Sequence, residues 1–338
     1  MRPTLVCPYC DGTRIRRDGL RATRHGSLQR YHCAFCERRF TPLTTTHRTY
    51  PVRVIIETLS RYNRLHPLPT VIEGVRRKFG VLVPESTARR WLADFASLTP
   101  FLRLRAAARA HAPVHRAIAE HRLLHGQVYD FKYHRTKTDL LLTSDPRNAP
   151  LASLQRYLEG IPEHCPHALF LKDTPRASQT AAAFPTHALR ITARRDNLAV
   201  ESARFALQAV ARNTERHPTV QEFLLVNDTA TVAVEVPIVL TAADLAHYRT
   251  LGFTIPLALP QGEVITGHLD VVQLRNGQVH ILDYKPDAAH VKPIEQLMVY
   301  ALALARRTGL RLYHFRCAWF DDRDYFEFYP LHLVHRTR

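Results

Sequence analysis

The chain has 338 residues, of which 46% are hydrophobic and 9% aromatic, so it can bury a full core and hold two or three globular domains. Its longest apolar runs are broken well short of a membrane span and no signal-peptide core opens the chain. These features argue against a membrane or secreted protein and predict a cytoplasmic, nucleoid-associated one. The net charge of +17 lies towards the front: residues 1–100 carry 18 Lys and Arg against 7 Asp and Glu, whereas residues 221–338 carry 11 against 13. The basic front is therefore the expected polyanion-binding end.

Two C-x-x-C pairs lie near the start of the chain. Cys7 and Cys10 form the first pair, and Cys33 and Cys36 form the second, with 22 residues between the pairs. Two tight turns that each supply two sulfurs suit tetrahedral Zn²⁺. Disulfides or a chance spacing are the alternative, but the chain has only two other cysteines. The spacing predicts a structural zinc site.

The segment between the two cysteine pairs is rich in arginine. Arg16 and Arg17 are the residues there that we expect to contact nucleic acid. The segment and its cysteines resemble the zinc ribbon at the front of some insertion-sequence transposases, over about 35 residues. The resemblance implies a DNA-binding zinc ribbon over residues 1–45.

Residues 51–98 predict three short helices. The first begins at Pro51, the second ends at Gly80, and the third covers residues 84–96. This layout resembles the helix-turn-helix of transposase N-termini, with the third helix as the recognition helix. A small helical bundle with a solvated basic face is the alternative. In the DNA-binding interpretation, the side chains that face DNA are Ser86, Thr87, Arg89 and Arg90, while Trp91 and Leu92 anchor the helix.

Residues 101–195 carry fewer signals. We expect residues 101–125 to be helical and residues 127–142 to form strands. Asp130, Asp139 and Asp145 could suggest the acidic set of a DDE transposase, but no pattern relates their positions, and we interpret them as surface residues. The two remaining cysteines, Cys165 and Cys317, are solitary and are expected to be small buried hydrophobes.

The last third of the chain predicts a sheet with helices around it. Residues 197–213 predict a helix, and residues 220–227 and 230–240 predict the first strands. Two closing strands are expected over residues 311–320 and 325–330.

Residues 264–285 carry the strongest signal. Two β-rich runs flank Asn276-Gly277, a dipeptide preferred in two-residue hairpin turns. Counting back from that turn places Asp270 opposite Asp283, with Cβ atoms roughly 4.5–5.5 Å apart. Like charges that face each other destabilise a sheet, so a divalent cation is expected to compensate them. Lys285 shares a strand face with Asp283. Surface residues at the end of a hairpin are the alternative.

A helix is expected after this hairpin, beginning at Pro293. Its apolar positions recur at helical spacing and predict ordinary core packing. Gln296 and Tyr300 lie four residues apart on a neighbouring face and could both lean over the end of the strand.

The pattern Gly267-x-x-Asp270, Asp283-x-Lys285 and Gln296-x-x-x-Tyr300 resembles the RecB-type branch of the PD-(D/E)XK nuclease superfamily. The resemblance covers about residues 197–330 and implies an α/β domain in which a mixed sheet is flanked by helices. It also implies that Mg²⁺ or Mn²⁺ is held by Asp270, Asp283 and the carbonyl of Tyr284. Lys285 would orient or activate the attacking water, and Gln296 and Tyr300 would support the site. Many members add a Glu or His; the candidates here, none in a recognisable motif, are Glu201, Glu215, His217 and Glu235.

Together these features predict four segments: a zinc ribbon (1–45), a helix-turn-helix (46–100), an intermediate region (101–195) and a nuclease domain (196–338). The expected function is metal-dependent cleavage of DNA, targeted by the front of the chain. Further expected partners are other recombination, transposition or defence proteins, and the chain is expected to be associated with a mobile element. One alternative is a non-catalytic DNA-binding regulator, against which the intact Asp270, Asp283 and Lys285 set argues. Another is a transposition or recombination protein in which cutting is one step.

Overall fold

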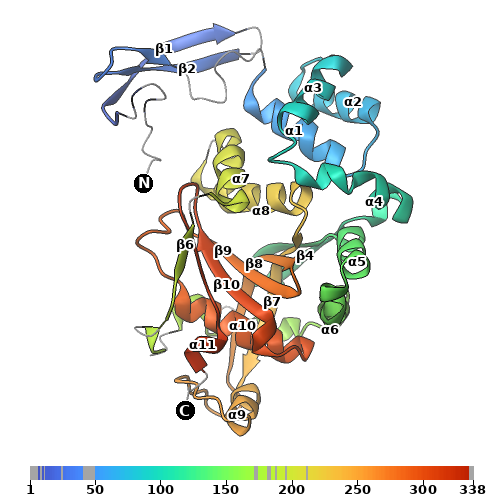
Figure 1. The fold of residues 1–338 in the computed structure, drawn as a ribbon, viewed down its shortest axis with the longest axis vertical. Coiled ribbons are helices and arrows are strands. Elements are labelled where there is room, and N and C mark those ends of the chain that lie inside the picture. The colour runs from blue at the N-terminus through green and yellow to red at the C-terminus, as the bar shows by residue number, and fades with distance from the viewer. Residues whose placement is uncertain are drawn as a thin grey trace. The chain divides into compact units, whose positions relative to one another are not determined.

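The structure is a computed structural model, which describes residues 7, 10, 12–23, 26–40, 50–170, 174–180, 184–186, 189–194, 196–210 and 212–334. The chain forms two compact units (Figure 1). The N-terminal unit comprises Met1–Tyr62 and His66–Phe95, and the C-terminal unit comprises Asn63–Leu65 and Ala96–Arg338.

The N-terminal unit begins with a three-stranded antiparallel sheet, in the order β1-β2-β3. Its strands are β1 (Ile15–Thr23), β2 (Gly26–Cys33) and β3 (Arg39–Phe40). The buried core of this sheet comprises Cys7, Cys33 and Phe40 among the described residues. A core of this size contributes little stability, so a bound metal would supply much of the folding free energy.

Three helices follow, as predicted: α1 (Val52–Asn63), α2 (Leu68–Phe79) and α3 (Glu85–Asp94). Gly80 ends α2 in a left-handed conformation with φ of 66°, from which its N–H bonds to the carbonyl of Arg76. Trp91 and Leu92 are buried as expected. The role of these helices in DNA binding remains a prediction.

The C-terminal unit is built on an eight-stranded sheet with strand order β4-β5-β7-β8-β9-β10-β11-β6. In the described part of the chain, β9 and β10 are the only parallel neighbours in this sheet. A helix, α10, connects them, as a parallel crossover requires. The mixed α/β class is thereby confirmed. The strands are β4 (Ala119–His125), β5 (Gln127–Tyr133), β6 (Thr192–Arg194), β7 (Thr231–Thr241), β8 (Val264–Arg275), β9 (Gln278–Tyr284), β10 (Phe315–Phe320) and β11 (Tyr325–Phe328).

Helices cover both faces of this sheet. Side chains of α6 and α10 share one buried cluster with Val272 and Ile281, whereas α7 and α8 share another with Val271 and Leu282. Neighbouring strand residues point to opposite faces, so both faces of β8 and β9 are buried. The helices of this unit are α4 (Arg105–His111), α5 (Arg135–Ser144), α6 (Ala152–His164), α7 (Leu198–Ala206), α8 (Arg216–Asn227), α9 (Ala242–Thr250), α10 (Ile294–Thr308) and α11 (Leu331–Val334).

The hairpin between β8 and β9 has the predicted register. Asn276 and Gly277 have φ angles of 54° and 74°, the positive values that a type I′ turn requires. The ladder pairs Arg275 with Gln278 and continues to Val271 and Leu282, where the antiparallel pairing of the two strands ends. Asp270 and Asp283 lie one position further on.

Three expectations about local structure are wrong. Residues 101–125 contain the short helix α4 and then strand β4 instead of one long helix, and residues 127–142 divide into β5 and helix α5. Residues 220–227 lie in α8 instead of a strand. Most of that segment is buried, so its apolar residues show no periodicity that could separate a helix from a strand.

Residues 63–65 belong to the C-terminal unit although they follow the body of α1. The Asn63 amide donates to the Asn227 carboxamide oxygen at 3.0 Å, in a buried environment. Arg64 pairs with Glu222 and, at 2.8 Å, with Glu120. Leu65 is fully buried beside Phe101.

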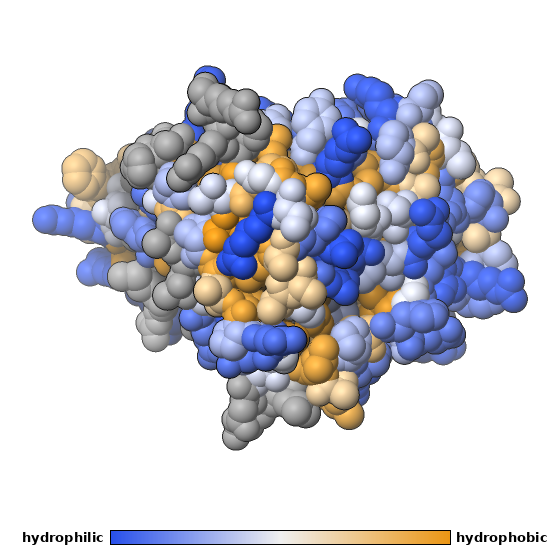
Figure 2. Space-filling view, turned by 90° about the horizontal axis from the view of Figure 1, so that it is seen from below, coloured by the Kyte–Doolittle hydropathy of each residue, from blue (hydrophilic) through white to orange (hydrophobic). Residues whose placement is uncertain are grey.

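Figure 2 views the end of the molecule that carries α9 and α11, where hydrophobic side chains gather among hydrophilic ones. A hollow of about 500 Å³ lies there, lined in part by the exposed Leu251 and Tyr313. In the described parts of the chain, no helix has the length and apolar character needed to cross a membrane.

Candidate active site

One cavity of about 280 Å³ in the C-terminal unit collects all five side chains that the sequence nominated for chemistry. They come from β8, β9, the residue just after β9, and the first turns of α10. The five are Asp270, Asp283, Lys285, Gln296 and Tyr300. Their chemical roles remain predictions.

Two carboxylates and an amine meet where β8 and β9 separate. Asp283 is 1% exposed, and its Oδ2 lies 2.7 Å from Lys285 Nζ. Asp270 Oδ2 accepts the backbone N–H of Tyr284 at 3.0 Å. The backbone N–H of Lys285 donates to Phe320 of β10, which holds the strand end in place. The two aspartates therefore line one cavity at the end of the hairpin, although they are not partners in the ladder.

Burial makes the acidic groups of this cavity difficult to ionise. Burial and the nearby charge of Asp270 raise the pKa of Asp283 to about 7. Burial, and to a lesser extent the charge of Asp270, raises the pKa of Glu235 to about 8. The ordinary value for an aspartate is 3.8. The cavity therefore stores electrostatic strain that a bound cation would relieve.

This strain predicts that Asp283→Asn stabilises the protein when no divalent cation is added. Between pH 4 and 7 the folded state holds a proton on Asp283 that the unfolded state has lost, so stability falls as pH rises through this window. Above pH 7 the variant should gain roughly 1–3 kcal/mol in unfolding free energy, and below pH 4 it should gain nothing. Urea denaturation at pH 5 and pH 8 measures this difference. Asp196→Asn, which alters an exposed carboxylate of the same unit, is the matched control.

A histidine and a glutamate complete the acidic side of the cavity. His217 of α8 lies with its Nδ1 3.6 Å from Asp270 Oδ2. Burial works against its charged form, but Asp270 outweighs that effect and raises the pKa of His217. Glu235 of β7 accepts from Gln221 at 2.7 Å and has a φ of 51°, so the strand is irregular at the cavity. Of the four extra candidates, these two line the cavity, whereas Glu201 and Glu215 are exposed and do not.

Tyr300 packs directly on the strand that carries Asp270. A Cβ atom at Gly267 would lie 2.6 Å from the Tyr300 ring, so only glycine allows this approach. Gln296 donates to the Tyr300 hydroxyl oxygen at 2.8 Å. The hydroxyl therefore keeps its own proton for an acceptor within the cavity. This contact explains why Gly267, Gln296 and Tyr300 occur together.

The cavity is also lined by residues that the sequence did not nominate. Arg176 enters from the loop before the 3₁₀ turn Ala177–Gln179, where it forms a parallel bridge with Thr266, and it donates to the Tyr129 hydroxyl at 3.1 Å. His268 stacks on Tyr129 with ring centroids 3.6 Å apart. His125, from the end of β4, also lines the cavity. Among these residues, only His268 could have been found from the sequence, because it lies inside the Gly267-x-x-Asp270 motif.

The carboxylate side of the cavity fits a divalent metal ion. In the described part of the chain, Asp283 Oδ1 is buried and has no hydrogen-bond partner. A buried carboxylate oxygen without a partner is costly unless a cation binds it. Carboxylate oxygens with an imidazole nearby suit Mg²⁺ or Mn²⁺. The residues that could hold such an ion are Asp270, Asp283, Tyr284 through its carbonyl, and His217.

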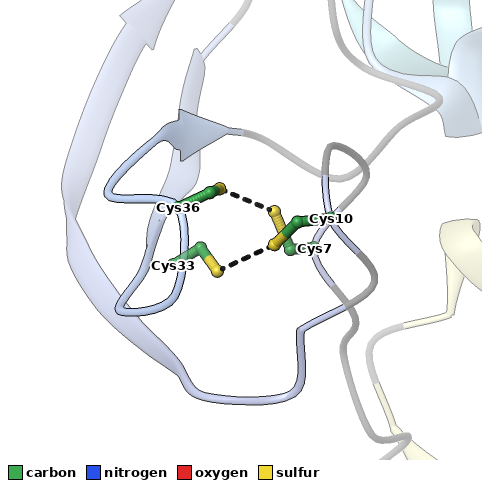
Figure 3. Close-up of side chains that lie close together, drawn as sticks. All are labelled: Cys7, Cys10, Cys33 and Cys36. Carbon is green, nitrogen blue, oxygen red and sulfur yellow. Dashed lines mark hydrogen bonds between the residues drawn. The ribbon is translucent and has the colours of Figure 1, made fainter.

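The four N-terminal cysteines converge as a zinc site would require (Figure 3). The Sγ atoms of Cys7 and Cys36 are 3.6 Å apart, and those of Cys10 and Cys33 are also 3.6 Å apart. Sulfurs bound to one tetrahedral zinc ion would lie about 3.8 Å apart. Backbone hydrogen bonds, led by that from Cys36, lower the pKa of Cys33 to about 7 and favour its thiolate.

The side chains nominated for nucleic-acid contact lie in the N-terminal unit. Arg16 and Arg17 are exposed on β1. On α3, Ser86, Arg89 and Arg90 are exposed and Thr87 is half-buried. Arg89 forms an ion pair with Glu85 at 2.5 Å, which nucleic acid would have to compete with.

The comparison with protein families gives one match. The family model of the PD-(D/E)XK nuclease superfamily matches residues 152–321, which is half of the chain. The matched range runs from α6 to the end of β10 and includes the carboxylate cluster, which we define as Asp270, Asp283, Tyr284 and His217. Neither the curated proteins nor the solved structures gave a significant match.

Proposed function

Because this chain belongs to the PD-(D/E)XK nuclease superfamily, we propose that it is a metal-dependent DNA nuclease directed to its substrate by the N-terminal unit. The observation that carries the proposal is the buried Asp283 carboxylate, which has one oxygen at Lys285 Nζ and the other without a partner. Such a group is costly in a protein that binds no cation, and it is useful in one that aims water at a phosphodiester.

The carboxylate cluster would hold the catalytic ion. Asp270, Asp283 and the Tyr284 carbonyl are the proposed ligands, with His217 as an additional one. The bound Mg²⁺ or Mn²⁺ would neutralise charge on the scissile phosphate and lower the pKa of a coordinated water. The backbone N–H of Tyr284 orients Asp270, because it donates to the carboxylate at 3.0 Å.

Lys285 is the proposed partner of the attacking water. Its Nζ lies 2.7 Å from Asp283 Oδ2, so the ammonium is held beside the carboxylate that the metal would also bind. From there it can orient the water and stabilise the charge that develops on the phosphate oxygens. Gln296 and Tyr300 act as supporting residues, because their mutual hydrogen bond fixes the Tyr300 hydroxyl at the cavity wall.

Arg176 is a candidate for holding the phosphate backbone of the substrate. It lines the same cavity as the carboxylates and is anchored by Tyr129. A guanidinium in that position can bind a phosphate through two parallel N–H groups.

The test is incubation of purified protein with linear, circular and single-stranded DNA in Mg²⁺, Mn²⁺ or EDTA. We expect cleavage with either metal and none in EDTA. Cleavage of the circular substrate would identify an endonuclease. Tight DNA binding without cleavage in any metal would favour the regulator and contradict the proposal.

The N-terminal unit is proposed to bind DNA through its ribbon and its third helix. If the four cysteines hold zinc, replacing Cys33 and Cys36 by Ser should release about one zinc ion per chain and unfold the ribbon. DNA binding should weaken, while the C-terminal unit stays folded. Metal analysis together with circular dichroism checks this. Natively purified, reduced protein that contains no zinc would contradict the prediction.

A further inference from the structure

A second group of metal-ligand side chains lies beside the cavity. His125 ends β4, Cys165 follows the last residue of α6, and His167 begins the 3₁₀ turn His167–Leu169. The two His ring nitrogens and the Cys sulfur that face one another all lie within 4.8 Å. In the sequence these residues are isolated, and Cys165 was expected to be a small buried hydrophobe. The structure places it, half-buried, next to two imidazoles.

The spacing of the three donors suits a small cation. His125 Nε2 and His167 Nδ1 are 2.8 Å apart. Two nitrogens on one tetrahedral zinc ion would be roughly 3.3 Å apart, and a nitrogen and a sulfur roughly 3.6 Å apart. To admit the ion, the two ring nitrogens would separate by about half an ångström. The sulfur, which lies within 4.8 Å of both nitrogens, would approach them by up to about 1.2 Å. Two imidazoles and a thiolate are the ligand types that zinc prefers to the lighter alkaline-earth ions.

The outer nitrogen of each imidazole has a partner, as it does in metal-binding histidines. His125 Nδ1 lies 2.8 Å from His268 Nε2, and His167 Nε2 lies 3.4 Å from the carbonyl oxygen of Pro162. With hydrogens on these outer atoms, His125 Nε2 and His167 Nδ1 both present lone pairs to the space beside Cys165. Such outer partners fix the tautomer and orientation of metal-ligating imidazoles.

The three histidines could also form a metal-free chain in which each ring donates through Nε2. That chain satisfies the imidazoles but gives Cys165 no function. In the part of the chain that the structure describes, the Cys165 sulfur makes no hydrogen bond, and the residue is held there by the backbone bonds Cys165 N–H to Ile161 and His167 N–H to the Cys165 carbonyl. A cation shared by the sulfur and the two imidazoles would use all three donors that the fold brings together.

We propose that His125, Cys165 and His167 bind a zinc ion, which is separate from the four-cysteine site and from the carboxylate site. Water would fill the fourth position. The ion would tie the end of β4 to the loop after α6. Through the His125–His268 contact it would also fix His268, which lines the same cavity as Asp270. The proposal does not depend on the nuclease function.

The test counts zinc by elemental analysis in the full chain. An Asp283→Asn background keeps zinc from occupying the carboxylate site. In that background we expect two zinc ions per chain. Cys165→Ser should leave one, and the Cys33→Ser and Cys36→Ser pair should also leave one. Changing all three cysteines should leave none. His164→Gln, which alters a neighbouring imidazole outside the cluster, should leave two.

Cobalt substitution gives an independent readout of the thiolate. In a background in which Cys7, Cys10, Cys33 and Cys36 are all changed to Ser, so that Cys165 is the remaining half-buried thiol, Co²⁺ should produce a near-ultraviolet thiolate-to-metal absorption band. Cys165→Ser and His167→Gln should each remove the band, while circular dichroism shows the fold retained. One zinc per chain with no change on Cys165→Ser, or a cobalt band that survives that substitution, would overturn the proposal.

Discussion

Replacing Asp270 or Asp283 with alanine should abolish DNA cleavage together with binding of the catalytic metal. Replacing Lys285 with alanine should abolish cleavage while metal binding is kept. Each rate should fall by on the order of a thousandfold or more, because charge stabilisation of the transition state is lost. The combined variants should be little worse than the single ones, since residues that act as one unit fail together.

The geometry predicts that the lysine variant and the aspartate variants differ in metal binding. Lys285 Nζ lies 2.7 Å from Asp283 Oδ2, where it competes with the metal for the carboxylate. Removing the Lys285 side chain should therefore leave the metal affinity unchanged or slightly higher. DNA affinity in EDTA should rise slightly in the aspartate variants, because a negative charge near the phosphate is removed. Gln296→Ala and Tyr300→Phe should reduce the rate less, since these residues support the site.

The assay is nicking and degradation of DNA across Mg²⁺ and Mn²⁺ titrations, with the fold of each variant checked by circular dichroism. Asp287→Ala and Lys292→Ala are matched controls, because both side chains are exposed just beyond the site. A well-folded Asp283→Ala protein that cuts as fast as the wild type would refute the proposed mechanism at its centre.

Neutralising the basic surface of the N-terminal unit should cause the second large effect. Changing four arginines to glutamine should weaken DNA binding roughly a hundredfold or more at low salt. The slope of the logarithm of the binding constant against the logarithm of the salt concentration should become shallower by up to about 4. The physical reason is that each arginine on a phosphate releases a condensed counterion. The four are Arg16, Arg17, Arg89 and Arg90.

The matched control removes the same charge from the C-terminal unit. Arg156, Arg190, Arg311 and Arg323 are exposed there, and changing them to glutamine should alter the salt dependence far less. Fluorescence anisotropy with labelled duplex between 50 and 300 mM salt measures both sets. Equal slopes for the two variants would show that the N-terminal unit is not the electrostatic anchor.

The core of the candidate site was predictable because its determinants are local. Asn276-Gly277 sets the turn, the turn sets the register, and the register brings Asp270 and Asp283 to the same end of the hairpin. Lys285 follows from the alternation of a strand, and Gln296 and Tyr300 from the repeat of a helix. None of these inferences needed a contact between distant segments.

The remaining walls of the cavity depend on such contacts. Arg176 and His125 come from segments about one hundred residues or more before Asp270, and their own neighbours in the sequence carry no motif. The helix α8, which delivers His217, was mistaken for a strand because its second half is buried on nearly every side. Tertiary packing decided both outcomes, and a single sequence does not record it.

The short segment Asn63–Leu65 limits how the two halves of this protein could have been assembled during evolution. The chain leaves the N-terminal unit, contributes three residues to the C-terminal one, and returns before α2. A gene fusion at residue 96 would supply a C-terminal unit without Leu65 in its core and without the Arg64 partner of Glu222. The N-terminal unit therefore could not be exchanged at that boundary without a replacement for these three residues.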